Sequence, residues 1–466
     1  MAETIAVVRE RPQLDDVLGA IREGAQRLRV EAYLVGGFVR DRLLGADGKD
    51  IDLLVVGAGA VELLGAVARS FDWAPPQVFE RFGTAQVRGD GFIVEAVGAR
   101  AERYDPASRK PDVTPGTLEE DVWRRDFTVN ALCQTQDGAV LDITGRGLAD
   151  LYAGVLRTPL DPRETFSEDP LRMYRAARFV AQLGFSLAPG VLDAMRDVAP
   201  RASILSVERV SEELRRLLTS PHPRAGMEVL RQSGLMQVHL HELLDMVGVE
   251  QSGYHVYDVY DHTMVALEHA PADLLVRLAV LLHDVGKPAT HAVAADGRHT
   301  FHDHPDVGAR IGENMLQRLR TGNAEIEAVA ALVRLHLRPI QYDKATFSDA
   351  AVRRLMRDAG ELRSRLLDVA RADTRASAFP DTVGIDELEE RMARLDAEAA
   401  GVAAPFESPL DGEEIMAMAG GRAAGPWVGA VKRALSDAVV EGEVAPGDAE
   451  GARRWLLDHP GLLVEG

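Results

Sequence analysis

The chain of 466 residues is 46% hydrophobic and 27% charged, with a formal net charge of −20, a composition typical of a globular protein of about three domains. It has no run of ~18 apolar residues, so we expect no membrane span. The first residues carry charges and no apolar signal core, which predicts a cytoplasmic protein, and the single cysteine excludes an intrachain disulfide framework.

The negative charge is unevenly distributed. Residues 381–466 hold 18 acidic and 7 basic residues, a net −11, which is over half of the total. The total speaks against a surface coated with positive charge for nucleic acid. The rest of the chain is only mildly acidic and can still carry a local basic groove.

The first third of the chain alternates strand-like runs with helical segments. Apolar side chains recur at helical spacing over residues 12–29 and 60–71. Short strand-like runs cover residues 32–37, 50–57, 84–89 and 91–97. From about residue 150 the remainder is helical. The pattern therefore predicts an α+β fold: a small mixed α/β head followed by a largely all-α remainder.

Two aspartates alternate with isoleucine in the segment YLVGGFVRDRLLGADGKDIDLLVVG, residues 33–57. On a strand, Asp50 and Asp52 would share one face. Mg²⁺ prefers such hard oxygen ligands and commonly bridges protein carboxylates to the phosphates of a substrate. By itself, an exposed pair of aspartates at a strand edge explains the pattern equally well.

The same segment places two glycines and a basic helix before the aspartates. Gly36 and Gly37 would let backbone N–H groups approach phosphates, and Arg40 follows one helical turn later. Further along, LEEDVWRRDFTVNAL (residues 118–132) brings Arg125 beside Asp126. A surface ion-pair cluster explains this second segment on its own, but beside a metal site an arginine would neutralise a triphosphate.

A second group of charges lies in FSEDPLRMYRAARFVAQLGF, residues 166–185, where we expect Ser167 to cap a helix. One helix face of about 120° would then present Glu168, Asp169, Arg172 and Arg175, with Arg178 at its margin.

An aspartate only accepts hydrogen bonds and an arginine only donates them, so Asp169 and Arg172 could accept cytosine and adenine while rejecting guanine and uracil. An amphipathic helix with internal ion pairs is the alternative.

Five ordered motifs then resemble a known family. The motifs LVGGFVRDRLLG…DID, RRDFTVNAL, DITGRGLADL, LRTPLDP and EDPLRMYRAARF are similar to those of the bacterial class II tRNA nucleotidyltransferases, the CCA-adding enzymes. The resemblance covers almost the whole chain. It implies a head related to DNA polymerase beta over residues 1–150, a base-recognising neck over 151–230, an HD domain over 231–378 and a helical tail over 379–466.

The resemblance also implies roles for individual residues. Asp50 and Asp52 would be the catalytic Mg²⁺ ligands, with Glu95 as a possible third carboxylate. The implied partners are tRNA, CTP and ATP, and the 3′-hydroxyl of tRNA would attack the α-phosphate and release pyrophosphate. The implied nucleotide-binding residues are Gly36, Gly37, Arg40, Arg125, Asp126, Asp169, Arg172, Arg175 and Arg178. Arginines of the neck, namely Arg209, Arg215 and Arg216, would bind the RNA.

A second set of motifs has the H…HD…H…H…D order of HD-domain phosphohydrolases. Its members are His262, His283, Asp284, His304, His336 and Asp373. Imidazole and carboxylate ligands suit a divalent transition metal such as Mn²⁺, Fe²⁺, Ni²⁺ or Zn²⁺. Lys287, which follows in HDVGKP, could contact a phosphate. Phosphohydrolase activity at this set is a further hypothesis.

Three alternatives stay open. The resemblance implies that CC-adding relatives lack a flexible loop, whereas residues 99–126 retain a polar, proline-bearing segment, which favours complete CCA addition or terminal A addition. A CC-adding enzyme and a poly(A) polymerase are the alternatives within this chemistry. An HD phosphohydrolase with a degenerate RNA-binding head is the alternative from another class.

Overall fold

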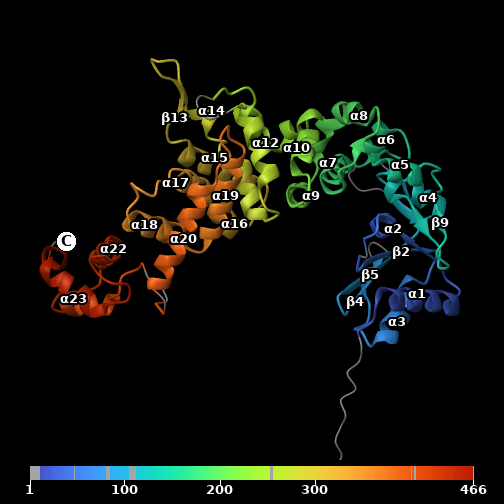
Figure 1. Ribbon diagram of the computed structural model, residues 1–466. Helices are drawn as coiled ribbons and strands as arrows, with labels where there is room; N and C mark the ends of the chain where they lie inside the picture. The colour runs from blue at the N-terminus through green and yellow to red at the C-terminus, as the bar shows by residue number, and fades with distance from the viewer. Residues whose placement is uncertain are drawn as a thin grey trace, which may run out of the picture. The chain divides into compact units, whose positions relative to one another are not determined.

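The computed structural model describes residues 11–46, 48–79, 84–103, 112–251, 256–399, 401–402 and 406–464. The chain forms two compact units, Met1–His239 and Leu240–Gly466 (Figure 1). Each unit is considered separately below. In the described parts of the chain, no helix combines the length and the apolar character that crossing a membrane requires.

The first unit begins with a seven-stranded sheet. Its strand order is β3-β4-β5-β2-β1-β8-β9, and only β2 and β5 pair in parallel. Helix α3 packs on β4 and β5, and α1 packs on α3 (Figure 1). The elements are α1 (Leu14–Leu28), β1 (Glu31–Val35), α2 (Gly36–Leu43), β2 (Asp50–Val56), α3 (Ala60–Phe71), β3 (Gln77–Phe79), β4 (Thr84–Gly89), β5 (Phe92–Gly98), β6 (Arg100–Arg103), β7 (Asp112–Pro115), α4 (Leu118–Trp123), a 3-10 helix (Thr128–Asn130), β8 (Cys133–Gln134) and β9 (Val140–Leu141).

The predicted elements of the head are confirmed to within two residues at each end, except that residues 36–37 of the predicted run 32–37 begin helix α2. Helix α3 occupies the predicted 60–71, and β4 occupies the predicted 84–89. Strand β2 keeps the expected alternation, because Ile51 is fully buried while Asp50 and Asp52 are exposed. The α+β fold class is therefore confirmed, with the sheet confined to the head.

The remainder of the first unit is mostly helical. Helix α7 packs between α9 and α10. The parallel pair β10–β11 was not predicted, because strands of two residues leave no periodic pattern in the sequence. The elements are α5 (Gly147–Ala153), β10 (Val155–Leu156), α6 (Pro162–Glu168), α7 (Leu171–Leu183), β11 (Ser186–Leu187), α8 (Val191–Val198), a 3-10 helix (Ala199–Ile204), α9 (Val207–Leu218), α10 (Pro223–Gln232) and α11 (Leu235–His239).

The predicted cap at Ser167 is wrong. Ser167 lies inside α6, whose N-cap is Asp161, and the Asp161 carboxylate accepts from the backbone N–H of Arg163 at 2.8 Å. Helix α7 starts separately after Pro170, and Asp169 Oδ1 accepts from the Leu171 N–H at 3.0 Å. Proline disfavours helical geometry at the residue before it, which separates the two helices.

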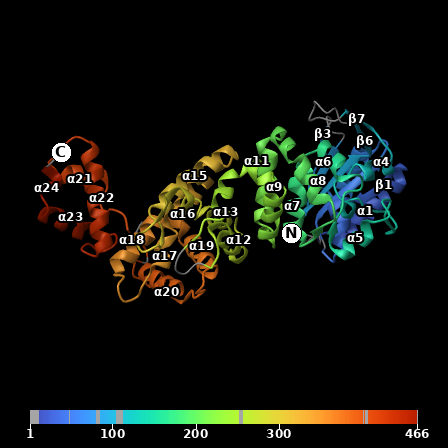
Figure 2. The same cartoon turned by 90° about the horizontal axis from the view of Figure 1, so that it is seen from above.

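In the second unit, α12, α15, α16 and α19 lie together in both views (Figures 1 and 2). Helix α13 packs against α12, α16 and α19. A short hairpin, β12–β13, precedes α15. The elements are a 3-10 helix (His241–Met246), α12 (Val259–His269), α13 (Leu274–Leu282), α14 (Lys287–Thr290), β12 (His291–Val293), β13 (His299–Phe301), α15 (His304–Arg318), α16 (Asn323–Leu335), α17 (Leu337–Ile340), α18 (Asp349–Ala359), a 3-10 helix (Gly360–Leu362), α19 (Arg363–Arg375), α20 (Val383–Glu398), α21 (Gly412–Met418), α22 (Pro426–Glu441), α23 (Ala449–Asp458) and α24 (Gly461–Val464).

Acidic residues near the C-terminus pair with arginines inside the second unit. Arg357 of α18 binds Asp437 of α22 at 2.7 Å, and Arg354 of α18 binds Glu441. Part of the negative charge of residues 381–466 is therefore neutralised within the fold.

Gly226 of α10 allows α10 to approach α7 closely. A Cβ atom added there would lie 2.8 Å from the carbonyl oxygen of Ala177 and 2.9 Å from Cβ of Ala181. Backbone atoms cannot move aside cheaply, so this glycine fixes the position of α7. By contrast, a Cβ atom added at Gly19 of α1 would meet nothing within 4 Å.

We expect Gly226→Ala to lower the free energy of unfolding by about 1–3 kcal/mol, because the added methyl group forces α7 and α10 apart. The matched variant Gly19→Ala should raise it by about 0.5–1 kcal/mol through helix propensity alone. Urea unfolding followed by circular dichroism measures both. A stability gain for Gly226→Ala would contradict the packing argument.

Candidate active site and metal centre

Three carboxylates lie together on one face of the parallel pair β2–β5, which are inner strands of the sheet. These residues, Asp50, Asp52 and Glu95, are called the acidic edge below. Asp52 lies directly opposite Glu95 in the strand register, and Asp50 is two residues earlier on the same face of β2. Directly opposed residues of paired strands project to the same side of the sheet. Three negative charges are therefore gathered at this edge.

The pKa of Asp52 is raised to about 6, although its side chain is exposed on one side. Desolvation by the surrounding protein is the largest cause, and the negative charge of Glu95 comes next. Asp50 adds to the effect, while Arg125 and Arg40 oppose it. A bound cation would offset both the desolvation of Asp52 and the repulsion from its acidic neighbours, so these residues fit a divalent metal.

The spacing of the three carboxylates limits how such an ion would be held. In the part of the chain that the structure describes, the groups of three ligand atoms within 4.8 Å of one another all lie in the second unit. Asp50, Asp52 and Glu95 do not form such a group. An ion at this edge would therefore take one or two of the carboxylates and further oxygens from elsewhere, which is the usual arrangement for Mg²⁺.

Gly36 brings the backbone close to this edge. Its φ of +69° lies in the left-handed region that favours glycine. A Cβ atom added there would lie 3.3 Å from Nη1 of Arg125 and 3.5 Å from Oδ2 of Asp52. The turn from β1 into α2 therefore meets a carboxylate and a guanidinium group at one point.

Arg40 is buried and contacts several parts of the first unit. It donates to Oδ1 of Asn130 at 2.7 Å and to Oδ1 of Asp41 at 2.7 Å. Its guanidinium group also lies over the ring of Phe179 in α7, 5.1 Å from the centroid. A Cβ atom added at Gly37 would lie 3.6 Å from Nη2 of Arg40. The predicted contact between these two residues and a nucleotide stays a prediction.

Asp121 orients the arginines of the RRD motif, and the sequence analysis missed it. This fully buried carboxylate binds Arg125 Nη2 at 2.9 Å and also binds Arg124. Arg125 Nη1 donates to the Asn130 carbonyl oxygen at 3.1 Å. The signal was present, because Asp121 lies three and four residues before the two arginines on the same helical face.

Asp126 joins the head to α7. Its Oδ2 accepts from Nε of Arg175 at 2.7 Å, and its Oδ1 accepts from Nδ2 of Asn130 at 3.0 Å. Desolvation alone would raise the pKa of this buried carboxyl. The positive charge of Arg175 and the hydrogen bond from Asn130 outweigh it and lower the pKa to about 2.

Asp169 and Arg172 both lie at the start of α7 and are bound to other protein groups. Oδ2 of Asp169 accepts from Nη2 of Arg209 at 3.3 Å. Arg172 donates to the carbonyl oxygens of Arg124 and Thr165 at 2.7 and 3.2 Å, and to Glu168 at 3.2 Å. The bond to Arg124 fixes the start of α7 against the RRD motif.

Arg178 lies one turn further along α7 and faces α9. Its Nε donates to Oε2 of Glu213 at 2.5 Å, and both residues are buried. Arg175 also approaches Glu213, at 3.8 Å. Glu213 was not predicted as part of the site, because its distance of 35 residues from Arg178 leaves no local pattern.

The six predicted HD residues converge in the second unit. The Nδ1 atoms of His283, His304 and His336 lie 2.7–2.8 Å from the backbone carbonyl oxygens of Val280, Phe301 and Val333 respectively. Such bonds fix the imidazole tautomer and leave Nε2 with a lone pair. Among the described residues, these three buried Nε2 atoms have no hydrogen-bond partner of normal geometry.

Two aspartates face these imidazoles. Asp284 lies 3.2 Å from Nε2 of His283 and 3.4 Å from Nε2 of His304, and Asp373 lies 2.8 Å from Nε2 of His262. The ligand atoms of His262, His283 and Asp284 all lie within 4.8 Å of one another. The atoms of Asp284, His304 and His336 form a second such group. Buried imidazole and carboxylate donors at this spacing fit a divalent transition metal.

A cavity of about 400 Å³ adjoins the HD residues and is lined in part by Asp284, Asp373 and Lys287. Nζ of Lys287 donates to Oδ2 of Asp284 at 2.7 Å and to Oε1 of Gln251 at 2.6 Å. Desolvation would lower the pKa of His283, but the charges of Asp284 and Asp373 raise it to about 9. The cluster therefore carries excess negative charge that a metal ion would balance.

Three family models match the chain. A poly A polymerase head domain matches residues 32–157, a probable RNA and SrmB-binding site of polymerase A matches residues 184–246, and an HD domain matches residues 253–378.

Curated relatives match over most of their length. An A-adding tRNA nucleotidyltransferase of Deinococcus radiodurans is 36% identical, over 92% of this chain and 96% of the relative. A CC-adding tRNA nucleotidyltransferase of Thermus thermophilus is 35% identical, over 92% and 93%. A multifunctional CCA protein of Neisseria gonorrhoeae is 37% identical, over 66% of this chain and 74% of the relative.

A solved structure, that of the Bacillus stearothermophilus CCA-adding enzyme in complex with CTP, has the same fold. It aligns with a TM-score of 0.69 over 97% of this chain and 98% of that chain, at 24% sequence identity.

We expect Asp126→Asn to lower the free energy of unfolding by about 1–3 kcal/mol at pH 7, because the variant leaves Arg175 without its buried counter-charge. The folded pKa of Asp126 lies below its ordinary value. The ion pair therefore contributes fully above about pH 4, and its contribution is lost as the pH falls toward 2.

Urea unfolding at pH 7, 5, 3.5 and 2.5 measures the difference between the wild type and the variant. This difference should be constant down to about pH 5 and should shrink below pH 4. The control Asp15→Asn, exposed on α1, should stay within ~0.5 kcal/mol of the wild type. A difference at pH 2.5 as large as that at pH 7 would argue against the assigned ion pair.

Proposed function

Because the chain belongs to the tRNA nucleotidyltransferase family, we propose that it adds the 3′-terminal CCA of tRNA, or its terminal A, from CTP and ATP without a nucleic-acid template. The carrying observation is that Gly36 lies beside both Asp52 and Arg125. The RRD motif in turn binds the start of α7, through the bonds Arg124–Arg172 and Asp126–Arg175. The tRNA 3′-hydroxyl would attack the α-phosphate, and pyrophosphate would leave. We place this activity in the cytoplasm, where its substrates are found.

The family implies dependence on a divalent metal, and we assign Mg²⁺ to Asp50 and Asp52 with Glu95 beside them. When bound, this ion would acidify the attacking hydroxyl and neutralise the phosphates. The protein supplies the remaining groups. Arg125, fixed by Asp121 at 2.9 Å, offers positive charge next to Asp52, and Gly36 leaves room for a phosphate to approach the backbone.

The start of α7 would select the base. Among the described residues, the three hydrogen bonds of Arg172 to protein atoms leave two of its five N–H donors for a ring nitrogen. Asp169 would accept from the exocyclic amino group of cytosine or adenine after exchanging its exposed partner Arg209. Guanine and uracil present the reverse pattern and would leave these groups unpaired, at a cost of about 1–3 kcal/mol each.

The choice between CCA, A and CC addition rests on the segment between the first two motifs. Strands β6 and β7 form an antiparallel pair at its start, and residues 104–111 of the predicted loop lie outside the described residues. The A-adding and CC-adding relatives match almost equally well, so identity does not separate the two specificities. The retained segment supports CCA or terminal A addition.

Three tRNA transcripts, ending before CCA, after CC and after CCA, are each incubated with single nucleoside triphosphates. We expect ATP to extend the CC-ended transcript by one residue and the CCA-ended transcript to remain unextended. Asp50→Asn and Asp52→Asn should each lower the extension rate at least ~10³-fold, because the metal would lose a charged ligand.

Asp15→Asn, which makes the same chemical change on the exposed face of α1, should retain the wild-type rate. Extension with CTP that stops before A would identify a CC-adding enzyme, and repeated addition of A would identify a poly(A) polymerase. The absence of extension by the wild type would favour an HD phosphohydrolase with a degenerate head.

The HD residues support a second activity, and we propose that they hydrolyse phosphate esters. His262, His283, Asp284 and Asp373 would hold one divalent transition metal, with His304 and His336 available for another. When bound, the metal would polarise the phosphoryl group and acidify a water molecule. Lys287 would contact the phosphate from the side of the cavity.

We expect the double variant His283→Ala, Asp284→Ala to lose metal-dependent hydrolysis of p-nitrophenyl phosphate and most of its bound transition metal, measured by mass spectrometry. Its tRNA extension should remain. His269→Ala, at the exposed end of α12, is the matched histidine control and should change neither property. Unchanged hydrolysis in the double variant would refute this activity.

A further inference from the structure

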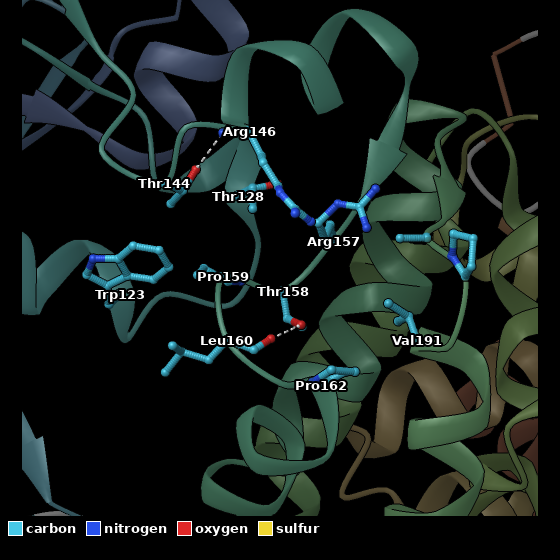
Figure 3. A pocket seen from close by; sticks show the side chains of 12 residues that line it. Trp123, Thr128, Thr144, Arg146, Arg157, Thr158, Pro159, Leu160, Pro162 and Val191 are labelled. Atoms are coloured by element: carbon cyan, nitrogen blue, oxygen red, sulfur yellow. Dashed lines mark hydrogen bonds between the residues drawn. The ribbon is translucent and has the colours of Figure 1, made fainter.

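A cavity of about 470 Å³ lies in the first unit, apart from the residues assigned above to catalysis and base selection (Figure 3). Its wall is built from the end of α4, the loop before α5, the LRTPLDP motif and the start of α8. A volume of this size accommodates a small organic ligand. The cavity is also built from two of the family-like motifs, DITGRGLADL and LRTPLDP, to which no chemistry has been assigned.

The lining carries positive charge and no acidic side chain. Arg146 and Arg157 line the cavity, while no aspartate or glutamate is among the residues that form its wall. This contrasts with the whole chain, which holds 73 acidic and 53 basic residues. Asp150, which does not line the cavity, pairs with Arg157, so Arg146 supplies the unpaired positive charge. Guanidinium N–H donors facing a cavity suit an anionic ligand.

The two arginines differ in how they are held. Nε of Arg157 donates to both carboxylate oxygens of the buried Asp150 at 3.2 Å, which orients the guanidinium group and leaves its two terminal nitrogens out of that contact. Asp150 is itself fixed by the hydroxyl of Thr128 at 2.7 Å. Arg146 is exposed, and its guanidinium group has no hydrogen bond or ion pair to the described residues.

An aromatic side chain faces the arginines across the cavity. Figure 3 shows Trp123 on one side and Arg146 and Arg157 on the other, with Pro159 between them and Leu160 and Pro162 lower in the view. Trp123 is 37% exposed, so part of its indole ring is accessible to a ligand in the cavity. The hydroxyl of Thr158 donates to the Leu160 carbonyl oxygen at 2.7 Å, which stiffens the Thr158–Leu160 segment of the cavity wall.

We infer that this cavity binds one unpaired nucleotide of the RNA substrate, with its base stacked on Trp123 and its phosphate held by Arg146 and Arg157. Base stacking on an aromatic ring combined with arginine contacts to the backbone is the general chemistry of single-stranded nucleic-acid binding. This inference rests on the proposed function.

The cavity is connected through the RRD motif to the acidic edge of β2–β5. Trp123 directly precedes Arg124 and Arg125, and the carbonyl oxygen of Arg157 accepts from the N–H of Thr128 at 2.8 Å. Thr128 begins the 3-10 helix whose Asn130 contacts Arg40 and Arg125. A nucleotide bound here would therefore hold the RNA on the same segment that positions Arg40 and Arg125, the arginines predicted to bind the incoming nucleotide.

The test measures the dissociation constant of the full-length protein for a tRNA transcript ending after CC, at several salt concentrations and without nucleoside triphosphate. Arg146→Ala should weaken binding and reduce the slope of log Kd against log salt by about 1, because one phosphate contact is lost. Trp123→Ala should weaken binding about 5- to 150-fold with an unchanged slope. Trp123→Phe, which keeps an aromatic face, should recover most of the affinity.

Arg27→Ala, which removes the same charge from the exposed face of α1, is the control and should leave the slope unchanged. The KM for ATP should be unchanged in all four variants. Wild-type tRNA affinity in both Arg146→Ala and Trp123→Ala would overturn the inference. It would also be overturned if these variants bound tRNA like the wild type but no longer bound free CMP or AMP, because that result would identify a mononucleotide site. If the wild type neither binds nor extends the transcript, the proposed function itself fails.

Discussion

The ion pair between the buried Asp126 and the partly exposed Arg175 is the constraint on which the first unit depends. It connects the end of the sheet domain to α7, and it does so with one carboxylate that also accepts from Asn130. Asn130 in turn contacts Arg40 and Arg125. A displacement of α7 would break the ion pair and also disturb the arginines at the acidic edge. In the proposed function, this connection would couple nucleotide recognition by α7 to phosphate positioning by these arginines.

The second unit uses a different principle. His283, His304 and His336 are buried, and each uses Nδ1 on a nearby backbone carbonyl oxygen, so that Nε2 is left for the centre of the cluster. Such a site is fixed before a metal arrives, since little of the ligand geometry has to be ordered on binding. The acidic edge of β2–β5 is more open, and an ion bound there would need further oxygens, such as those of the proposed nucleotide substrate. The imidazole-rich cluster suits a transition metal, whereas carboxylates completed by other oxygens suit Mg²⁺.

The sequence was sufficient where a residue's role is set by local periodicity. Asp50, Ile51 and Asp52 alternate between exposed and buried as a strand requires. It was insufficient where the partner is distant along the chain. Glu213 binds Arg178 across 35 residues, and the choice of that partner depends on how α7 packs against α9.

Local signals also competed with one another at the start of α7. Ser167 has a residue type favoured at helix starts, but Asp161 followed by Pro162 forms a stronger helix start six residues earlier. Pro170 then ends one helix and begins the next. As a result, Glu168 and Arg172 belong to different helices, yet they still form an ion pair at 3.2 Å. Glu168 and Arg172 therefore lie close together as predicted, but because two helices meet at Pro170 and not because the residues share one helix face.

Net charge was the least informative global property, because the chain separates its charges spatially. Acidic residues of α22 are paired with arginines of α18, and several arginines of the first unit are held by buried aspartates. A buried carboxylate such as Asp121 or Asp150 does not cancel the function of its arginine. It removes the conformational freedom of a long side chain and leaves other N–H donors oriented outward. An acidic protein can in this way present a few rigid cationic groups where a phosphate must be held, without a generally basic surface that would bind any polyanion.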